Sequence, residues 1–512
     1  MANKQLLSLA RRSHKPPSSF TVVRSSSSAA EEFIKPPPPT AMIYDRIAHS
    51  LKSKLQKLEK PDIRFLKYGS PHPTQSSHTH ILSLPETKIT TLPNGLRVAT
   101  ESTSNSRTAT VGLWIDAGSR FESDETNGTA HFLERMIFKG TEKRRSEEEI
   151  ENMGGHLNGY TCREETAYYA KVMGNGVLKA VDILADMLQN SKLEEGCISR
   201  ERDAILREVQ AGEHTEEAVF DHLHSTAFQY SPLGRSIHGA VANIKTISTE
   251  HLHHYIHTHY TTPRMVLAAS GAVKHDQIVE KANKLFTKLS SDSTTAKEPA
   301  TFTGSEVRII NDYVPLAKFA IAFEATSSTD PDSIALMVMR EMLGSWNKNA
   351  GGGKHMGSEL AQRVSINGIA ESMMAFSTNY KDTGLFGVYA VAKPDCLGDL
   401  SFAIMSAITK LAYRVSEDDV IRARNQLKSS LMLHTDGTSP VAEDIGRQLL
   451  TYGRRIPIAE LFARIDAVDP STIKRVANRY FYDRDIAISA IGPIKELPDY
   501  NWFRRRTYWN RY

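Results

Sequence analysis

The chain has 512 residues, of which 40% are hydrophobic, and its formal net charge is +4. This length is enough for two or more domains with substantial cores. The small charge gives no argument for nucleic-acid binding, and no apolar run approaches the roughly 18–20 residues that span a bilayer. The cysteines are three in number and widely separated, which indicates neither a disulfide framework nor a zinc knuckle.

The first thirty residues differ in composition from the rest of the chain. They are rich in serine, have no acidic residue before Glu31, and carry five bases, namely Lys4, Arg11, Arg12, Lys15 and Arg24. This composition is typical of an organelle transit peptide, although a disordered basic tail is the alternative. We therefore predict a transit peptide and linker at residues 1–50.

The folded part is predicted to begin near residue 86 with a hairpin, because Asn94-Gly95 stands between two alternating runs. A buried strand (TATVGLWIDAG) and a polar loop follow, and then a helix that contains His131. The remaining elements expected in this half are a strand at 158–172, helices at 178–191 and 198–212, and a closing strand at 259–273.

The second half repeats this order of elements. Strand, polar loop and apolar helix recur at 318–344, and an Arg-x-Arg pair at 200 recurs at 422, roughly 220 residues later. Self-similarity of this kind predicts two homologous domains. We therefore predict an α+β fold of two tandem domains, each an antiparallel sheet packed by helices, at 86–289 and 307–512 with a polar linker at 290–306.

The helix in the stretch 128–141 carries an incomplete metal-binding motif. His131 and Glu134 are spaced as in H-x-x-E-H, in which two histidines bind zinc and the glutamate serves the water. Position 135 is an arginine, which offers no lone pair to a metal. The motif reads H-x-x-E-R.

Two further acidic residues are present in the first half only. Glu201 and Glu208 are seven apart and so lie on one helical face. Their counterparts in the second half are Ala423 and Ser430, so the fold does not need these charges. A solvated helix face is the usual place for such residues, but their coincidence with a His-x-x-Glu helix favours a functional site.

The motifs GTAHFLE-x-MIFKGT, NGYTCREETAYYAK and ERDAILRE together resemble the pitrilysin-type zinc metallopeptidase family. The similarity runs from about residue 86 to the C-terminus. It looks closest to the β-type processing-peptidase subunits of plant mitochondria, which also serve as core subunits of respiratory complex III. It implies two pitrilysin-like domains, the second of them inactive.

The resemblance also implies an activity and a set of partners. The activity is a zinc metalloendopeptidase that removes presequences from imported precursors. The partners are an α-type subunit in a heterodimer, complex III subunits and presequence peptides, with no nucleic acid and no membrane span of its own. The location is the mitochondrial matrix or the matrix side of the inner membrane, which agrees with the transit-like leader.

Family roles can be carried over to matching positions of this chain. By resemblance, His131 would be the first zinc ligand, Glu208 the third and Glu134 the general base. Glu201 would orient the zinc ligands without binding the ion itself.

The substrate positions follow in the same way. Glu217 and Asp221, four apart on a helix, would bind the arginine that precedes presequence cleavage sites. Asn158 would lie on an edge strand that receives the substrate as an added strand.

Three positions depart from the family pattern. The second ligand falls on Arg135, Gly159 stands where the family favours alanine, and Ala211-Gly212 interrupts a stretch that is usually more acidic. A fixed cation about 4 Å from a zinc ion would repel it by an amount on the order of 8 kcal/mol, as an upper figure. Arg135 is better suited to replace the ion, by neutralising Glu134 and Glu208.

Two hypotheses follow, and length, leader and repeat do not separate them. One is a presequence endopeptidase in which Glu201 or water fills the missing ligand position. The other is a non-catalytic core subunit that pairs with an α-type homologue and supports complex III. Arg135 favours lost or weakened catalysis, unless codon 135 is itself an error in the gene model.

Overall fold

The computed structural model describes residues 85–508 apart from 142, 144–145, 293–297 and 351–355. The predicted transit peptide and linker at 1–50 lie outside the described residues. Within the part that is described, no helix combines the length and the hydropathy needed to cross a bilayer.

The first half of the chain forms a six-stranded sheet with the strand order β1-β2-β6-β3-β5-β4. Neighbouring strands run antiparallel except β2 and β6, which are parallel. The predicted hairpin at Asn94-Gly95 joins β1 to β2, and Gly95 takes the positive φ of 91° that such a turn requires. The strands are β1 (Lys88–Thr91), β2 (Arg97–Ser102), β3 (Thr108–Ile115), β4 (His156–Thr161), β5 (Thr166–Met173) and β6 (Met265–Gly271).

The second half forms another six-stranded sheet, with the order β7-β12-β8-β11-β10-β9. Only β7 and β12 are parallel in it. The strands are β7 (Ser305–Ile310), β8 (Ala317–Ala325), β9 (Ser345–Asn347), β10 (Ser372–Asn379), β11 (Gly384–Ala392) and β12 (Ile486–Gly492).

The two sheets correspond strand by strand once β1 and β9 are left out. The orders β2-β6-β3-β5-β4 and β7-β12-β8-β11-β10 then match, with the parallel pair at the same place. The predicted α+β fold of two tandem domains is confirmed. Each sheet is mixed rather than wholly antiparallel, because long crossovers through several helices let the first and last strands of each half run the same way.

The helices of the first half other than α7 pack on one face of its sheet and share a core with it. In α5 the buried residues Val177, Val181, Leu184 and Leu188 recur every three or four positions, which places them on one helical face. Burial of each stabilises the fold by about 1.5–3 kcal/mol. The helices are α3 (Thr129–Ile137), α4 (Ser146–Asn152), α5 (Val177–Asn190), α6 (Glu195–Gly212), α7 (Glu216–Ala227), α8 (Val241–Thr246), α9 (Thr249–His259) and α10 (His275–Leu285).

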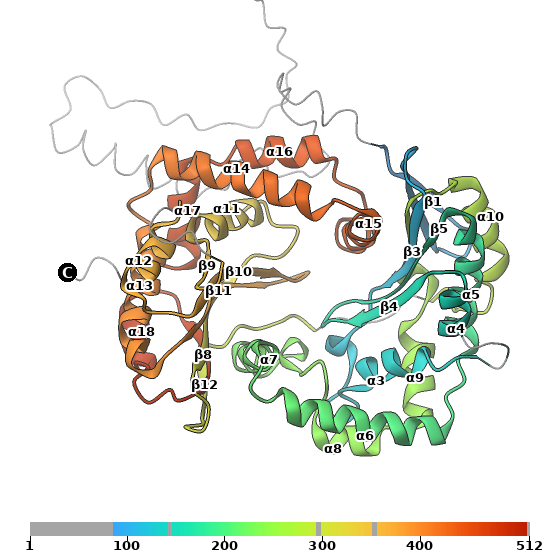
Figure 1. Ribbon diagram of the computed structural model, residues 1–512, viewed down its shortest axis with the longest axis horizontal. Coiled ribbons are helices and arrows are strands. Elements are labelled where there is room, and N and C mark those ends of the chain that lie inside the picture. Colours follow the sequence, from blue (N-terminus) through green and yellow to red (C-terminus); the bar gives the residue numbers. More distant parts are fainter. Residues whose placement is uncertain (1–84, 142, 144–145, 293–297, 351–355, 509–512) are drawn as a thin grey trace, which may run out of the picture. The chain divides into compact units, whose positions relative to one another are not determined.

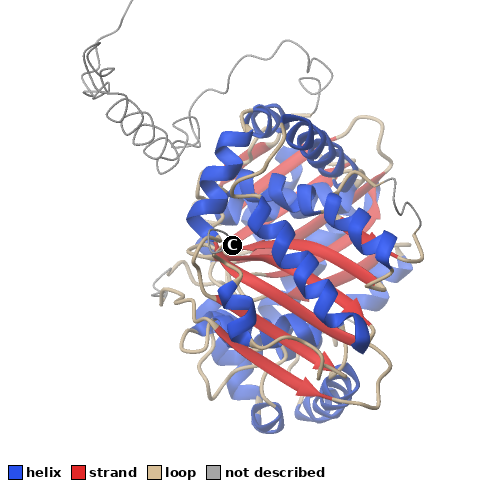
Figure 2. Cartoon of the chain, turned by 90° about the vertical axis from the view of Figure 1, so that its left-hand side faces the viewer, coloured by secondary structure: helices blue, strands red, loops and turns tan. Residues whose placement is uncertain are grey.

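The second half has an equivalent core between its sheet and helices, which lie over the strands in Figure 2. The helices are α11 (Ser333–Leu343), α12 (Glu359–Asn367), α13 (Leu397–Lys410), α14 (Glu417–His434), α15 (Thr438–Tyr452), α16 (Ile458–Asp466), α17 (Pro470–Tyr480) and α18 (Tyr500–Arg505). Helix α11 is the first α-helix after β8, as α3 is the first after β3, and α11 packs against α14 as α3 packs against α6.

Each sheet receives a helix from the other half on its second face (Figure 1). Along β6, Leu267 and Ala269 belong to the core of the first half, while the alternate residues Val266 and Ala268 pack against Ile445 of α15. Successive strand residues point to opposite faces, so α15 covers the face that the first half leaves open. Helix α7 does the same for β8 and β12 of the second sheet.

Polar contacts also join the two halves. The guanidinium of Arg120 donates to both carboxylate oxygens of Asp382 at 2.7 and 2.5 Å. The Tyr380 hydroxyl lies 2.8 Å from Nε2 of His224, and Nη1 of Arg97 donates to the carbonyl of Leu449 at 2.7 Å.

Candidate functional site

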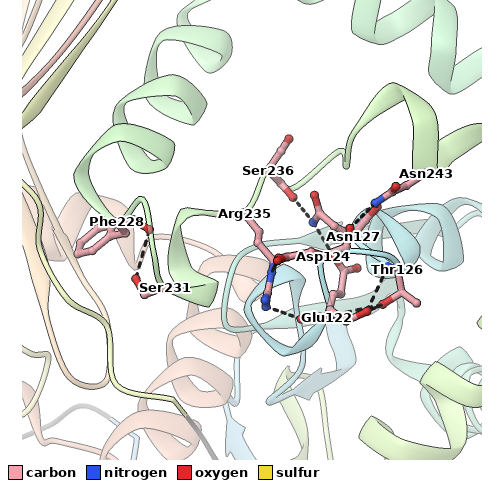
Figure 3. Close-up of polar contacts among 11 residues, drawn as sticks. Glu122, Asp124, Thr126, Asn127, Phe228, Ser231, Arg235, Ser236 and Asn243 are labelled. Atoms are coloured by element: carbon pink, nitrogen blue, oxygen red, sulfur yellow. Dashed lines mark hydrogen bonds and ion pairs between the residues drawn. The ribbon is translucent and has the colours of Figure 1, made fainter.

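Helix α3 starts at a buried carboxylate (Figure 3). Glu122 accepts hydrogen bonds from the backbone N–H groups of Gly128 at 2.9 Å and Ala130 at 2.6 Å, and from Nδ2 of Asn127 at 2.8 Å. An anion at this end suits the unpaired N–H groups and the dipole of the helix. Burial nevertheless raises the pKa of Glu122 to about 7.

A loop around residue 235 braces the same end of α3 (Figure 3). Nε of Arg235 donates to Asp124 at 2.7 Å, and Nδ2 of Asn127 donates to the carbonyl of Ser236 at 2.8 Å. The loop then passes so close to Gly128 that an added Cβ there would lie 2.8 Å from the carbonyl oxygen of His238. These contacts fix the first turn of α3 and bring His238 to it.

His131, in that first turn, faces the ring of His238 at a centroid distance of 4.7 Å. Its Nδ1 is buried and has no hydrogen-bond partner among the described residues. Burial, followed by the charges of His238 and Arg135, lowers the pKa of His131 to about 3. The imidazole is therefore neutral at physiological pH.

Glu134 lies one helical turn further on and is half-buried. Burial raises the pKa of its carboxyl, and the attraction of Arg135 and His238 opposes that shift. A half-buried carboxylate beside a neutral imidazole can act as a proton acceptor.

Arg135 extends from α3 to the facing helix α6 and bonds two carboxylates there. Its Nε donates to Glu201 at 3.0 Å, and its Nη1 lies 2.9 and 2.7 Å from the two oxygens of Glu208. Lys139 makes a second ion pair with Glu201 at 2.8 Å. Burial would raise the pKa of Glu201, but the hydrogen bonds from Lys139 and Arg135 outweigh it and the pKa is lowered.

The expected substrate positions fall on two elements near this site. Glu217 is exposed on α7. Asp221, one turn later, forms an ion pair with Arg163 at 2.5 Å, and this cation, acting against burial, lowers the pKa of Asp221. Asp221 is thus already bonded to an arginine of the chain itself.

Asn158 lies on β4, which is the outermost strand of the first sheet, as expected. Within the described residues β4 pairs with β5 alone, whereas its counterpart β10 also pairs with β9. A groove of ≈ 390 Å³ runs beside β4 and is lined by residues that include Asn158, Tyr169 and Ser439. The open edge and the groove leave room for an extended peptide.

Comparison with known proteins identifies the family. The model for "Insulinase (Peptidase family M16)" matches residues 97–241, and that for "Peptidase M16 inactive domain" matches 246–427. The chain belongs to peptidase family M16.

Similar members of family M16 carry related names. The chain is 69% identical to a probable mitochondrial-processing peptidase subunit beta of Arabidopsis thaliana, with full coverage of both chains. It is 49% identical to mitochondrial-processing peptidase subunit beta of Homo sapiens, covering 86% of this chain and 91% of the human one. A chain of complex III2 from Candida albicans superimposes with a TM-score of 0.75 at 27% identity, covering 82% of this chain and 99% of that chain.

Family M16 implies a zinc ion, and the donor set of this chain does not fit one. Of the three positions that the resemblance assigns as ligands, His131 has a nitrogen without a partner among the described residues, position 135 is a cation, and both oxygens of Glu208 are bonded to that cation. Among the described residues, no group of three or more histidine, cysteine or acidic side chains is arranged to hold a metal. Arg135 and Lys139 instead form ion pairs with Glu201 and Glu208, and we call these four residues the arginine-centred ion cluster.

The pairing of Arg135 differs in one respect from what the sequence led us to expect. Arg135 bonds Glu208 as expected, but its other partner is Glu201 and not Glu134. Glu134 is adjacent to Arg135 on α3, and neighbouring residues of a helix point in different directions. The long arginine therefore reaches the opposite helix, while Glu134 remains beside His131.

Gly159 and Gly212 are the two smaller departures from the family pattern, and the structure shows how each is accommodated. At Gly159 an added Cβ would meet the tip of the Phe138 ring at 2.8 Å and the Ala167 carbonyl at 3.0 Å. Glycine therefore fits this position of β4 without displacing a neighbour. Gly212 ends α6 with open space around it.

Two residues of this M16 site carried no signal in the sequence. Glu122 lies in a polar loop with no periodic pattern, and His238 lies in a loop more than a hundred residues beyond His131. The N-terminal N–H groups of a helix need hydrogen-bond acceptors. A search for an acidic residue that could cap α3 would therefore have been the way to find Glu122.

Proposed function

We propose that this chain is a processing-peptidase β-type subunit in which presequence cleavage is lost or severely weakened, so that it acts as a non-catalytic core subunit. The observation that carries the proposal is the bonding of Arg135 to both Glu201 and Glu208. Water activation by a zinc ion requires an intact ligand set. Here one ligand is replaced by a cation that also neutralises the third.

Recognition of presequences is proposed to persist. The free edge of β4 can add a peptide strand through main-chain hydrogen bonds. The exposed carboxylate of Glu217 is available for a substrate arginine, while Asp221 is shared with Arg163. A basic presequence would then be held at the site without being cut.

Partner and location follow from the named relatives. Proteins called processing-peptidase beta subunits, and a chain of complex III, are among the proteins similar to this chain. We infer an α-type subunit as partner, association with complex III, and a place in mitochondria, on the matrix side of the inner membrane. The acid-free leader at 1–30 supports import.

The test compares variants assembled with an α-type subunit. Single-turnover cleavage of a presequence peptide is measured for the unmodified chain, Arg135→His, and Arg135→His with Glu134→Gln. We expect the unmodified chain to cut orders of magnitude more slowly than Arg135→His, because the histidine completes the ligand set while the arginine cannot. Glu134→Gln should abolish whatever Arg135→His restores.

Peptide binding is measured in the same preparations by fluorescence anisotropy. The unmodified chain should bind the presequence about as well as Arg135→His does, and Glu217→Gln should weaken binding in both. Full cleavage by the unmodified chain would overturn the proposal. An Arg135→His chain that binds zinc but remains inactive would place the loss in other residues as well.

A further inference from the structure

Helix α9 carries an unusual number of histidines, and it lies outside the site described above. Its sequence, TEHLHHYIHTH, contains His251, His253, His254, His257 and His259. The environment of each decides what it can do.

Two of these histidines are already used by the fold. His259 is buried, and its Nδ1 lies 3.2 Å from Nη1 of Arg264. His251 belongs to a capping box at the start of α9, where its Nδ1 accepts from the Ser248 backbone N–H at 3.2 Å. Neither nitrogen is available to a ligand from solution.

The other three are exposed and share one stripe of the helix with an acid. Glu250, His253, His254 and His257 occupy positions i, i+3, i+4 and i+7, which coincide on one face of an α-helix. All four side chains are exposed, and no hydrogen bond or ion pair engages them in the described part of the chain. His253 and His257, four apart on this stripe, are therefore accessible to an ion from solution.

The spacing of His253 and His257 is that of a metal chelate. Side chains four apart on a helix have Cβ atoms about 5–6 Å apart. Two imidazoles at this distance can direct one nitrogen each to a common ion at about 2.0–2.1 Å, as paired histidines do in helical zinc motifs. No third protein donor converges on them among the described residues, so the remaining positions of an ion here would be filled by water.

We propose that His253 and His257 form a solvent-open chelate for a divalent transition-metal ion, with Cu²⁺ bound more tightly than Zn²⁺ or Ni²⁺. Imidazole nitrogen is a good ligand for all three, and copper leads the series at a site that imposes little geometry. His254, three before His257, offers an alternative second nitrogen, and Glu250 adds a negative charge one turn before. The chelate is a site of its own and does not depend on the proposed function.

The position of α9 gives the proposal a practical consequence. Helix α9 packs against α3 (Figure 1). Leu252 and Tyr255 of α9 are buried, while the four residues of the stripe are exposed. An ion on the stripe is thus separate from the arginine-centred ion cluster. Bulk metal analysis of the chain would report the stripe as well as any ion at α3.

The test uses the mature chain purified without a histidine tag and stripped with EDTA. Cu²⁺ is titrated by calorimetry, and the bound ion is examined by electron paramagnetic resonance. We expect one tight Cu²⁺ per chain with hyperfine splitting from two nitrogens. His257→Ala should weaken it by about 100-fold, since loss of even a supporting partner of a ligand costs 10–100-fold. His253→Ala should weaken it less, because His254 can then pair with His257, and the double variant His253→Ala, His257→Ala should lose the tight site.

Two matched variants separate this site from others. His251→Ala changes a histidine of the same helix outside the stripe, and Arg135→Met changes the α3 site; both should retain one tight Cu²⁺. Circular dichroism checks that each variant is folded. Unchanged Cu²⁺ binding in the His253→Ala, His257→Ala double variant would overturn the proposal, and so would loss of binding in Arg135→Met.

Discussion

Arg135 bonds two carboxylates that differ in exposure. The Glu201 side chain is 12% exposed and that of Glu208 is 52% exposed. Solvent screens an exposed ion pair strongly, so the bond to Glu208 contributes little, whereas an unpaired and nearly buried Glu201 would be costly. The stabilising part of the arginine-centred ion cluster is therefore its Glu201 side.

Replacing Arg135 with methionine should lower the free energy of unfolding by about 1–2 kcal/mol, because Glu201 then keeps only Lys139. Urea denaturation in a double-mutant cycle measures it. Arg135→Met combined with Glu201→Gln should show a coupling energy clearly larger than the combination with Glu208→Gln. Equal couplings would contradict this account of the cluster.

The buried carboxyl of Glu122 should make the free energy of unfolding depend on pH. Burial raises its pKa from 4.5 to about 7 in the folded chain, so the folded chain binds this proton more tightly than the unfolded chain does. The resulting stabilisation is complete below about pH 4.5 and is lost as pH rises through about 7. A shift of this size corresponds to about 3 kcal/mol.

Glu122→Gln removes that titration. The stability of the variant relative to the unmodified chain should therefore rise between about pH 5 and 8. Chemical denaturation at several pH values gives the difference, in which the other titrating groups cancel. Ser123→Ala, which changes an exposed residue of the same loop that carries no titrating group, is the control and should show a flat difference.

At this scale the sequence predicted which residue types form the site but not how they pair. The spacing of His131, Glu134 and Arg135 places them on one helix. It does not determine which way a long arginine turns, so its second partner was predicted wrongly. Glu122 and His238 reach the site through tertiary folding of loops, and no local pattern marks such residues.

Among the elements, α15 depends on a close approach to β3. An added Cβ at Gly446 would lie 2.4 Å from the Trp114 ring, which is fully buried. In an ordinary helix, glycine to alanine stabilises by up to about 1 kcal/mol. In α15 the same change forces the helix away from the sheet.

Gly446→Ala should therefore destabilise the chain, by about 1–3 kcal/mol as overpacked cores do. Gly398→Ala in α13, where an added Cβ meets nothing within 4 Å, is the matched control and should be neutral or slightly stabilising. Thermal denaturation followed by circular dichroism compares them. A stable Gly446→Ala chain would mean that α15 can shift along the sheet at little cost.

Elements were predicted well where a pattern is local. Alternation and the Asn94-Gly95 turn gave the first hairpin, and helical periodicity gave α3, α5 and α6. The strand order and the parallel pairs could not be predicted from the sequence, because hydrophobic periodicity identifies a strand but not the strand with which it pairs. The same holds for α7 and α15, whose apolar faces do not state which sheet they cover.

For the whole molecule, the exchange of α7 and α15 means that the two halves are held together by more than the segment that joins them. Each exchanged helix buries apolar residues of both halves, and Arg120 and Tyr380 add polar contacts. Cutting the chain between the halves removes none of these contacts.

A protease site introduced in the proposed linker 290–306 tests this. After complete cleavage the two fragments should elute together on size exclusion in native buffer and separate only in denaturant. Gly446→Ala in the nicked chain should promote separation, since it weakens one of the two exchanged helices. Fragments that separate at once in native buffer would contradict the prediction.

The exchange also sets an order of events while the chain is made. Synthesis delivers the N-terminal half first, and α7 is then available before the sheet that it covers exists. The first sheet, by contrast, must wait for α15, some 170 residues after its last strand, to cover Val266, Ala268 and Trp114. Until α15 arrives, this apolar face of the first sheet, which includes the Trp114 ring, is exposed to solvent and prone to aggregation. We therefore expect a chaperone to bind the nascent first half. The chaperone should dissociate once residues 438–452 have been made and α15 can cover the sheet.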